Sequence, residues 1–160
     1  MDSSKIFIVG ANGQLGTALR AQYPEARSAD ISTLDITNRE SVEQFDWSGI
    51  EIILNAAAFT NVDGAETAEG RIAAWNVNAS AVANLVRVAQ KYDITLVHIS
   101  SDYVFDGTIE PHLETEPLSP LSVYGASKAA GDIAVSLLDK HYIVRTTWVI
   151  GEGKNFVRTM

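Results

Sequence analysis

A tyrosine and a lysine four residues apart, Tyr124 and Lys128 in "SVYGASK", are the side chains best suited to acid–base chemistry. At this spacing on a helix, both project from the same face. A tyrosine exchanges a proton near neutral pH only if its pKa falls by about three units, a cost of roughly 4 kcal/mol that nearby positive charge can supply. We therefore expect Tyr124 to be a proton donor whose pKa is lowered by Lys128.

Two serines in "ISSDYVFDG" directly follow an apolar run. A hydroxyl there can cap the strand or hydrogen-bond the carbonyl oxygen of a substrate. We expect Ser101 to hold such a carbonyl beside Tyr124, and Ser100 to close the strand over a cofactor. Without this serine and the glycine motif described next, the Tyr-x-x-x-Lys pattern would indicate only a solvated pair on a helix.

The first apolar run leads into "GANGQLG", which carries Gly10, Gly13 and Gly16. Glycines permit the turn, the close approach of a pyrophosphate and tight helix packing, while the helix N-terminus supplies N–H donors. Asp30 lies at the end of the second expected strand, about 20 residues on, where an acid can bond ribose hydroxyls. The pattern predicts dinucleotide binding; a tight turn without a ligand is the alternative.

Strand-length apolar runs alternate with longer segments of helical periodicity. The expected strands are Lys5–Val9, Ala26–Asp30, Glu51–Asn55, Thr95–Ser100 and Tyr142–Thr146. The expected helices are Gly13–Gln22, Arg39–Phe45, Arg71–Lys91 and Tyr124–Asp139. The pattern Thr37-x-x-Glu40 predicts a capping box for the second helix. This succession predicts an α/β fold: a Rossmann-type, doubly wound parallel sheet with helices on both faces and a long surface loop over Glu110–Ser122.

Two further segments follow expected strands, at the edge where open α/β sheets bind ligands. In "TLDIT", Asp35 and Ile36 fall where the adenine end of a dinucleotide would lie; an Asx or capping turn is the alternative. In "LNAAAFTNVDGAE", three alanines would let a cofactor cross the strand end with little steric hindrance.

The amino-acid composition argues against several classes of protein and of binding site. The 160 residues, 46% of them hydrophobic, suffice for one domain. A net charge of −8 argues against nucleic acid as a partner, and the lack of cysteine excludes disulfides and thiolate metal sites. No signal-peptide or membrane-span pattern occurs, and His98 reads as a packed residue. We expect a cytoplasmic protein with no structural metal and no membrane partner.

Five motifs together, "GANGQLG", "NAAAFTNVDGAE", "SSDYVFDG", "YGASK" and "RTTWVIGEGKNF", resemble the extended short-chain dehydrogenase/reductases, and most closely the dTDP-4-dehydrorhamnose reductases. The resemblance implies hydride transfer from NADPH or NADH to the C4 carbonyl of dTDP-6-deoxy-L-lyxo-4-hexulose, giving dTDP-L-rhamnose. Tyr124 would donate the proton, Lys128 would bind the nicotinamide ribose and Ser101 would orient the carbonyl. The family commonly has threonine at the position of Ser101, so the β-branch that restricts χ1 is missing here.

The resemblance also implies further contacts. Those expected with the cofactor are Gly10, Gly13, Gln14, Leu15 and Gly16 at the pyrophosphate, Asp35 and Ile36 at the adenosine, and Ala56, Ala57 and Thr60 at its middle. Those expected with the sugar are Tyr103 and Trp148. Because the family continues beyond "NFVRTM" with a second, smaller domain, residues 1–160 would be the cofactor half of a longer polypeptide, ending inside the next helix. We expect this half to bind dinucleotide and turn over sugar poorly or not at all. A homodimer, or a fusion to another dTDP-rhamnose pathway enzyme, is the expected assembly.

Two other functions stay open. One is another extended short-chain enzyme, a nucleotide-sugar epimerase or dehydratase; dehydratases have an acidic pair where Asp102 is here followed by Tyr103. The other is a non-catalytic NADP-binding regulatory subunit resembling the β-subunit of methionine adenosyltransferase. Trp148 and "TNVDGAE" favour the reductase. Arg27 and Arg39 are both candidates for binding a 2′-phosphate, so the choice between NADP and NAD stays open.

Overall fold

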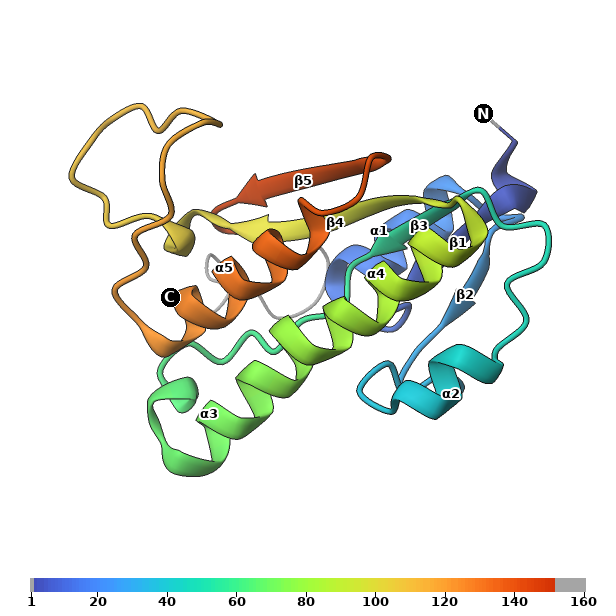
Figure 1. Cartoon of the computed structure of the whole chain (residues 1–160), viewed down its shortest axis with the longest axis horizontal. Helices are drawn as coiled ribbons and strands as arrows, with labels where there is room; N and C mark the ends of the chain where they lie inside the picture. Colours follow the sequence, from blue (N-terminus) through green and yellow to red (C-terminus); the bar gives the residue numbers. More distant parts are fainter. Residues whose placement is uncertain (1, 152–160) are drawn as a thin grey trace.

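A computed structural model, which describes residues 2–151, shows one five-stranded parallel sheet (Figure 1). Its strands, in spatial order, are β2 (Arg27–Ala29), β1 (Ile6–Val9), β3 (Ile52–Asn55), β4 (Thr95–Ser101) and β5 (His141–Thr146). The chain passes from β1 to β2 on one side and then to β3 on the other. The strand order therefore reverses between β1 and β3, and a ligand crevice is expected at the carboxyl ends of these strands.

Helices cover both faces of the sheet, as expected for a doubly wound α/β fold. They are α1 (Gln14–Gln22), α2 (Arg39–Gln44), α3 (Ala68–Trp75), α4 (Ala81–Tyr92) and α5 (Val123–Val135). Helices α4 and α5 pack on each other and on β4, and α2 packs on α4. Right-handed crossovers place α1 on the opposite face, because the β1 to β2 connection runs the other way across the sheet (Figure 1).

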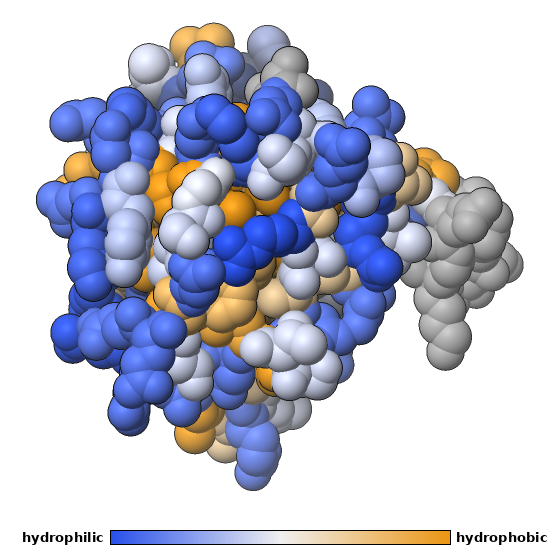
Figure 2. Space-filling view, turned by 90° about the vertical axis from the view of Figure 1, so that its right-hand side faces the viewer, coloured by the Kyte–Doolittle hydropathy of each residue, from blue (hydrophilic) through white to orange (hydrophobic). Residues whose placement is uncertain are grey.

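The largest buried aromatic group closes the amino end of the sheet. Trp47 lies edge-on to Phe7, with ring centroids 5.0 Å apart, and its indole N–H donates to the Val42 carbonyl at 2.9 Å. Figure 2 views the molecule from this side: hydrophilic side chains make up most of the surface, with hydrophobic ones showing between them. The aromatic packing thus stabilises the end of the sheet remote from the expected ligand crevice.

Two helices differ from their expected bounds by more than one residue. The single helix expected over Arg71–Lys91 runs from Ala68 to Tyr92 and contains a π-helical turn at Asn76–Ser80. The last expected helix ends at Val135 rather than Asp139, where the Ser136 hydroxyl donates back to the Ile133 carbonyl at 2.8 Å. The next helix, expected to include "NFVRTM", lies outside the described residues.

The capping box expected at Thr37 is wrong. The N-cap of α2 is Asn38, whose side-chain oxygen accepts from the Ser41 N–H at 3.2 Å. The Thr37 hydroxyl instead donates to the Asp35 carboxylate at 2.7 Å, as part of an Asx turn, and so it does not cap the helix. Within residues 2–151, no helix is long and apolar enough to cross a bilayer.

Candidate active site

A cleft of about 820 Å³ opens at the carboxyl ends of the strands. It is bordered by the glycine turn, the loop after β3, the end of β4, the start of α5 and the segment after β5. The strand arrows of β4 and β5 point to this edge in Figure 1. The volume lies in the range of small-molecule sites, and the position is the one that the strand order predicts.

The glycine turn forms a cradle with no room for side chains. Gly10 has a φ of +79°, and a Cβ there would lie 2.6 Å from the Ala57 nitrogen. A Cβ on Gly16 would overlap the Gly10 carbonyl. Gly13 is the N-cap of α1 and provides no side-chain cap, so the first amides of the helix remain for a ligand. These features fit a pyrophosphate bound at a helix N-terminus.

Asp30 presents an exposed carboxylate just after β2. It accepts from the Ser32 N–H at 2.9 Å and the Ser32 hydroxyl at 2.7 Å, and the hydroxyl bond is the main cause that lowers its pKa. Asn12, in the glycine turn, donates its amide to the same carboxylate and accepts from Arg20 at 3.4 Å. Asp30 is thus an anchored anion beside the turn, as a ribose-binding acid requires.

The segment around Asp35 takes the conformation that was the alternative to adenosine binding. The Asp35 carboxylate accepts from the Thr37 N–H at 2.9 Å, which forms an Asx turn. Ile36 is 6% exposed within the main hydrophobic core, and its carbonyl accepts from Asn84 at 2.9 Å. Neither Asp35 nor Ile36 borders the cleft.

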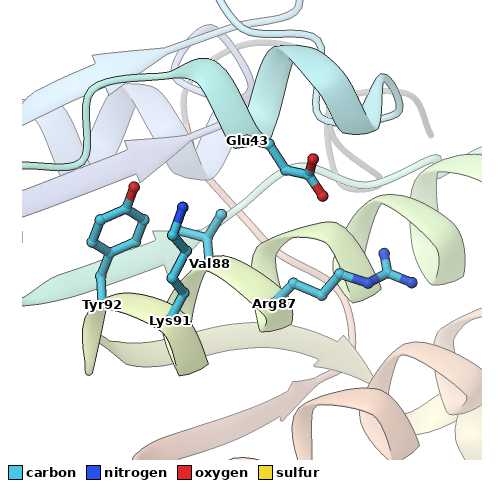
Figure 3. A pocket seen from close by; sticks show the side chains of 5 residues that line it. All are labelled: Glu43, Arg87, Val88, Lys91 and Tyr92. Carbon is cyan, nitrogen blue, oxygen red and sulfur yellow. The ribbon is translucent and has the colours of Figure 1, made fainter.

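The two arginines considered for a 2′-phosphate are held elsewhere. Arg27 donates to the Asp46 carbonyl at 2.7 Å, at the amino end of β2, and Arg39 pairs with Glu43 at 2.6 Å. Glu43 also borders a small hollow between α2 and α4, about 140 Å³ in volume (Figure 3). The other residues that line this hollow are Arg87, Val88, Lys91 and Tyr92, all on α4. The hollow combines charged side chains with a small volume and lies apart from the carboxyl ends of the strands.

Contacts at the start of α5 fix the position of Tyr124. Ser122 caps the helix, because its hydroxyl accepts from a first-turn amide at 3.0 Å. The Glu66 carboxylate, from the segment before α3, accepts from the Val123 N–H at 2.9 Å. The rings of Tyr124 and Tyr103 meet edge to face, with centroids 5.7 Å apart at 87°. Both rings border the cleft.

The expectation that Lys128 lowers the pKa of Tyr124 is wrong for this structure. The pKa of Tyr124 is raised, chiefly by burial; the Ser101 hydroxyl opposes this and the Asp102 charge adds to it. The Lys128 ammonium is directed to the Ile99 carbonyl, to which it donates at 2.6 Å. Tyr124 therefore carries its proton at neutral pH, which suits a donor.

Ser101 both caps a turn and borders the cleft. Its hydroxyl donates to the Asp102 carboxylate at 3.1 Å and accepts from the Tyr103 N–H at 3.2 Å, at the start of a 3₁₀ turn. Both Ser101 and Ser100 border the cleft. To hold a carbonyl oxygen, Ser101 would turn its single proton from Asp102 toward the cleft.

Lys128 is almost fully buried, with 1% of its surface exposed. Burial lowers its pKa to about 8, and the Asp132 charge partly offsets this. His98, fully buried beside it, has a pKa well below its ordinary value because of burial and the Lys128 charge. The interpretation of His98 as a packed residue agrees with this environment.

Asn78 is a site-forming residue that the sequence did not single out. In the π-helical turn its side chain accepts from the Phe59 N–H at 2.9 Å and donates to the Phe59 carbonyl at 3.1 Å. It also donates to the Ser127 hydroxyl on α5 at 3.0 Å. Asn78 thus joins the loop after β3 to the helix of Tyr124. The available signal was a second asparagine in "WNVNAS", within a stretch in which small and apolar residues dominate.

The structure brings most predicted site residues to one cleft. Those that border it are Gly13, Gln14, Leu15, Ala56, Thr60, Ser100, Ser101, Tyr103, Tyr124, Lys128 and Trp148. Those that do not border it are Gly10, Gly16, Asp30, Asp35, Ile36 and Ala57. Ala58, the third alanine of the segment that a cofactor was expected to cross, also borders it. Bordering residues that the sequence did not predict are Val62, Asp63, Ile99, Asp102, Thr146, Thr147 and Val149.

Comparison with known proteins identifies close relatives. Residues 4–160 match the model of the family described as "RmlD substrate binding domain". A dTDP-4-dehydrorhamnose reductase of Aggregatibacter actinomycetemcomitans is 41% identical over 98% of this chain and 56% of its own length. The crystal structure of a dTDP-4-dehydrorhamnose reductase from Clostridium acetobutylicum superposes with a TM-score of 0.89 at 41% identity, over 96% of this chain and 57% of the other.

A second solved structure carries a cofactor. It is a dTDP-4-dehydrorhamnose reductase of Bacillus anthracis in complex with NADP, with a TM-score of 0.88 and 41% identity over 96% of this chain and 57% of the other. The chain thus spans a little over half the length of the relatives that it matches.

Proposed function

Since the chain belongs to the RmlD substrate-binding-domain family, we propose that it forms the cofactor-binding part of a dTDP-4-dehydrorhamnose reductase. The proposed reaction is reduction of the C4 carbonyl of dTDP-6-deoxy-L-lyxo-4-hexulose to give dTDP-L-rhamnose. One observation carries the proposal: a single cleft joins a glycine-capped helix N-terminus to a protonated tyrosine and a strand-end serine.

Three residues of the cleft have separate roles in the proposed carbonyl reduction. When bound, the reduced dinucleotide supplies the hydride. Tyr124, protonated and fixed at the start of α5, donates a proton to the carbonyl oxygen. Ser101 donates a hydrogen bond to the same oxygen and so orients the carbonyl. Lys128 borders the cleft one helical turn from Tyr124, where its N–H groups would hold the nicotinamide ribose.

The cofactor in this proposal is NADPH or NADH. The N-terminus of α1, beside Gly13, would hold the pyrophosphate, and Asp30 would bind the adenosine ribose. An anionic Asp30 favours the 2′-hydroxyl of NADH and opposes a 2′-phosphate. Arg20, linked to Asp30 through Asn12, is the cation in this hydrogen-bonded chain and can compensate the phosphate.

The sugar side of the site is also part of the proposal. Tyr103 and Trp148 border the cleft from two different strand ends and would contact the sugar. The other contacts with the dTDP-sugar would come from the length that the relatives have beyond the matched region. We therefore expect residues 1–160 alone to bind dinucleotide and to turn over the sugar nucleotide poorly or not at all. The relatives named as dTDP-4-dehydrorhamnose reductases favour the reductase over the epimerase, dehydratase and regulatory-subunit alternatives.

A reaction assay tests the proposal. The full-length protein is mixed with NADPH and dTDP-6-deoxy-L-lyxo-4-hexulose; the loss of nicotinamide absorbance is followed, and the product is identified by chromatography. We expect sugar-dependent oxidation of NADPH at kcat above about 1 s⁻¹, with dTDP-L-rhamnose formed in equal amount. NADPH binding without any sugar-dependent oxidation would instead support the regulatory-subunit alternative.

A further inference from the structure

Behind the cleft, a buried chain of polar side chains connects three strands to α5. Its members are Asn55 at the end of β3, His98 on β4, Asp132 on α5 and Arg145 on β5. The first three are at most 1% exposed. Burying a carboxylate and polar groups costs free energy unless they are paired, so this chain needs an explanation.

The hydrogen bonds assign the tautomer of His98. The side-chain oxygen of Asn55 accepts from the Ala57 N–H at 3.2 Å, so its NH₂ group is the end that faces His98 Nδ1, at 3.0 Å. Nδ1 is therefore the acceptor, and the neutral ring carries its proton on Nε2. That proton lies between two charged groups: Nε2 is 3.5 Å from Lys128 Nζ and 3.8 Å from Asp132 Oδ1.

Lys128 and Asp132 are one helical turn apart, a spacing at which a lysine and a carboxylate commonly pair. In the described part of the chain they form no ion pair within 4.0 Å; Asp132 pairs instead with Arg145 at 3.0 Å. The Ser100 hydroxyl lies close enough to help lower the pKa of Asp132, against the raising effect of burial. Within residues 2–151, Ser100 Oγ and Asp132 Oδ1 are buried atoms without a hydrogen-bond partner.

The ammonium of Lys128 is left with donors to spare. It has three N–H groups, and the Ile99 carbonyl accepts one of them at 2.6 Å. His98 Nε2 carries its own proton and cannot accept another. The remaining donors belong to a side chain that borders the cleft.

We propose that the His98–Asp132 pair positions Lys128: it keeps a buried carboxylate near the ammonium but out of contact, so that spare N–H groups face the cofactor. The inference deepens the proposed function and rests on it, because it assumes that Lys128 binds the cofactor ribose. Arg145 holds Asp132 away from Lys128, and Asn55 fixes the ring that separates them. His98 and Asp132 are positioning residues, since they act through Lys128.

The groups around Lys128 determine whether each variant raises or lowers the pKa of this lysine. They are neutral His98 from β4 and Asp132 from α5, with Arg145 from β5 paired to Asp132. The Asp102 charge acts on Tyr124, whose pKa it raises. Removing the carboxylate charge disfavours the ammonium and lowers the pKa of Lys128. Removing the imidazole lets the carboxylate approach and raises that pKa.

The test is an NMR titration of lysine labelled with ¹³C at Cε in the full-length protein, with the Lys128 signal assigned by loss in Lys128→Met. We expect Asp132→Asn to move the Lys128 midpoint down by about one unit or more, and His98→Leu to move it up. Asp132→Glu, which keeps the charge, should stay near the wild-type midpoint. An unchanged midpoint in Asp132→Asn, or a fall in His98→Leu, would overturn the proposal.

Turnover provides the second readout. In Asp132→Asn, the decline of kcat at alkaline pH should begin at lower pH than in the wild type, with Asp132→Glu restoring it; a uniform loss of kcat at all pH values would indicate a merely structural role and overturn the proposal. If Asp132→Asn does not fold, the Lys128 midpoints of Asp132→Glu and His98→Leu test the proposal in its place. The NMR titration does not need turnover, so a wild-type protein that fails to reduce the sugar nucleotide would refute the proposed function and still leave the positioning of Lys128 decided.

Discussion

Replacing Gly10 with alanine should cost more free energy of unfolding than the same replacement at Gly49. The two positions have nearly the same left-handed backbone, with φ of +79° and +75°. An added Cβ therefore introduces similar backbone strain, about 1–2 kcal/mol, at either position. The surroundings differ: a Cβ at Gly49 meets nothing within 4 Å, whereas at Gly10 it lies 2.6 Å from the Ala57 nitrogen and 2.9 Å from the Ala56 carbonyl carbon.

The excess cost can be worked from this overlap. Ordinary contact begins at 3.4 Å, so the Ala56–Ala57 backbone must retreat by about 0.8 Å from a Cβ at Gly10. Overpacking of this kind costs about 1–3 kcal/mol beyond the strain. The same movement displaces Ala56, which borders the cleft, and weakens its N–H bond to the Val9 carbonyl, now 3.0 Å long. We expect the NADPH dissociation constant of Gly10→Ala to rise about tenfold or more, which corresponds to about 1.4 kcal/mol.

Urea unfolding of both variants and NADPH titration by fluorescence provide the measurements. Gly49→Ala should lose about 1–2 kcal/mol and bind NADPH as the wild type does. The reasoning would be refuted if Gly10→Ala were as stable as Gly49→Ala, or if it bound NADPH with the wild-type dissociation constant.

Three further predictions concern specificity and stability. Asp30→Asn should weaken NADH binding about threefold to tenfold while NADPH binding weakens less or improves, because a charged acceptor for the 2′-hydroxyl is lost; Asp106→Asn, which removes the same kind of Asx-turn carboxylate, should change neither dissociation constant. His98 stays neutral when folded and takes up a proton when unfolded, so below its ordinary pKa of about 6.5 the unfolded state binds more protons and stability falls as pH falls. Urea unfolding from pH 7 to pH 5 should show this loss, up to about 1.4 kcal/mol per pH unit, and His98→Leu should show a shallower slope. Trp47→Phe should cost about 1–3 kcal/mol because it removes a buried 2.9 Å hydrogen bond, whereas Trp75→Phe, at a half-exposed position, should cost less in the same assay.

The sequence predicted the sheet and most of the cleft because both depend on local patterns. The glycine turn, the strand-end serines and the Tyr124–Lys128 spacing each follow from short stretches, and parallel strands bring their carboxyl ends together. The place of Asp35 was not decided locally, because an Asx turn and adenosine binding require the same residue type.

The buried polar contacts could not be predicted in the same way. Asn78 reaches Phe59 and Ser127, which are 19 and 49 residues away in the chain. The direction of the Lys128 ammonium depends on the Ile99 carbonyl, 29 residues away, so the pKa of Tyr124 could not be inferred from the helical spacing alone. Such contacts arise from the packing of elements, which a one-dimensional pattern does not specify.

The central claim, that Tyr124 donates the proton for carbonyl reduction in this cleft, is tested most directly by the turnover of Tyr124→Phe in the full-length protein. NADPH affinity should stay near the wild-type value, while kcat for the dTDP-sugar falls about 100-fold or more. Tyr142→Phe, on an exposed tyrosine of β5, should keep the wild-type kcat. A Tyr124→Phe protein that reduced the sugar at the wild-type rate would contradict the account.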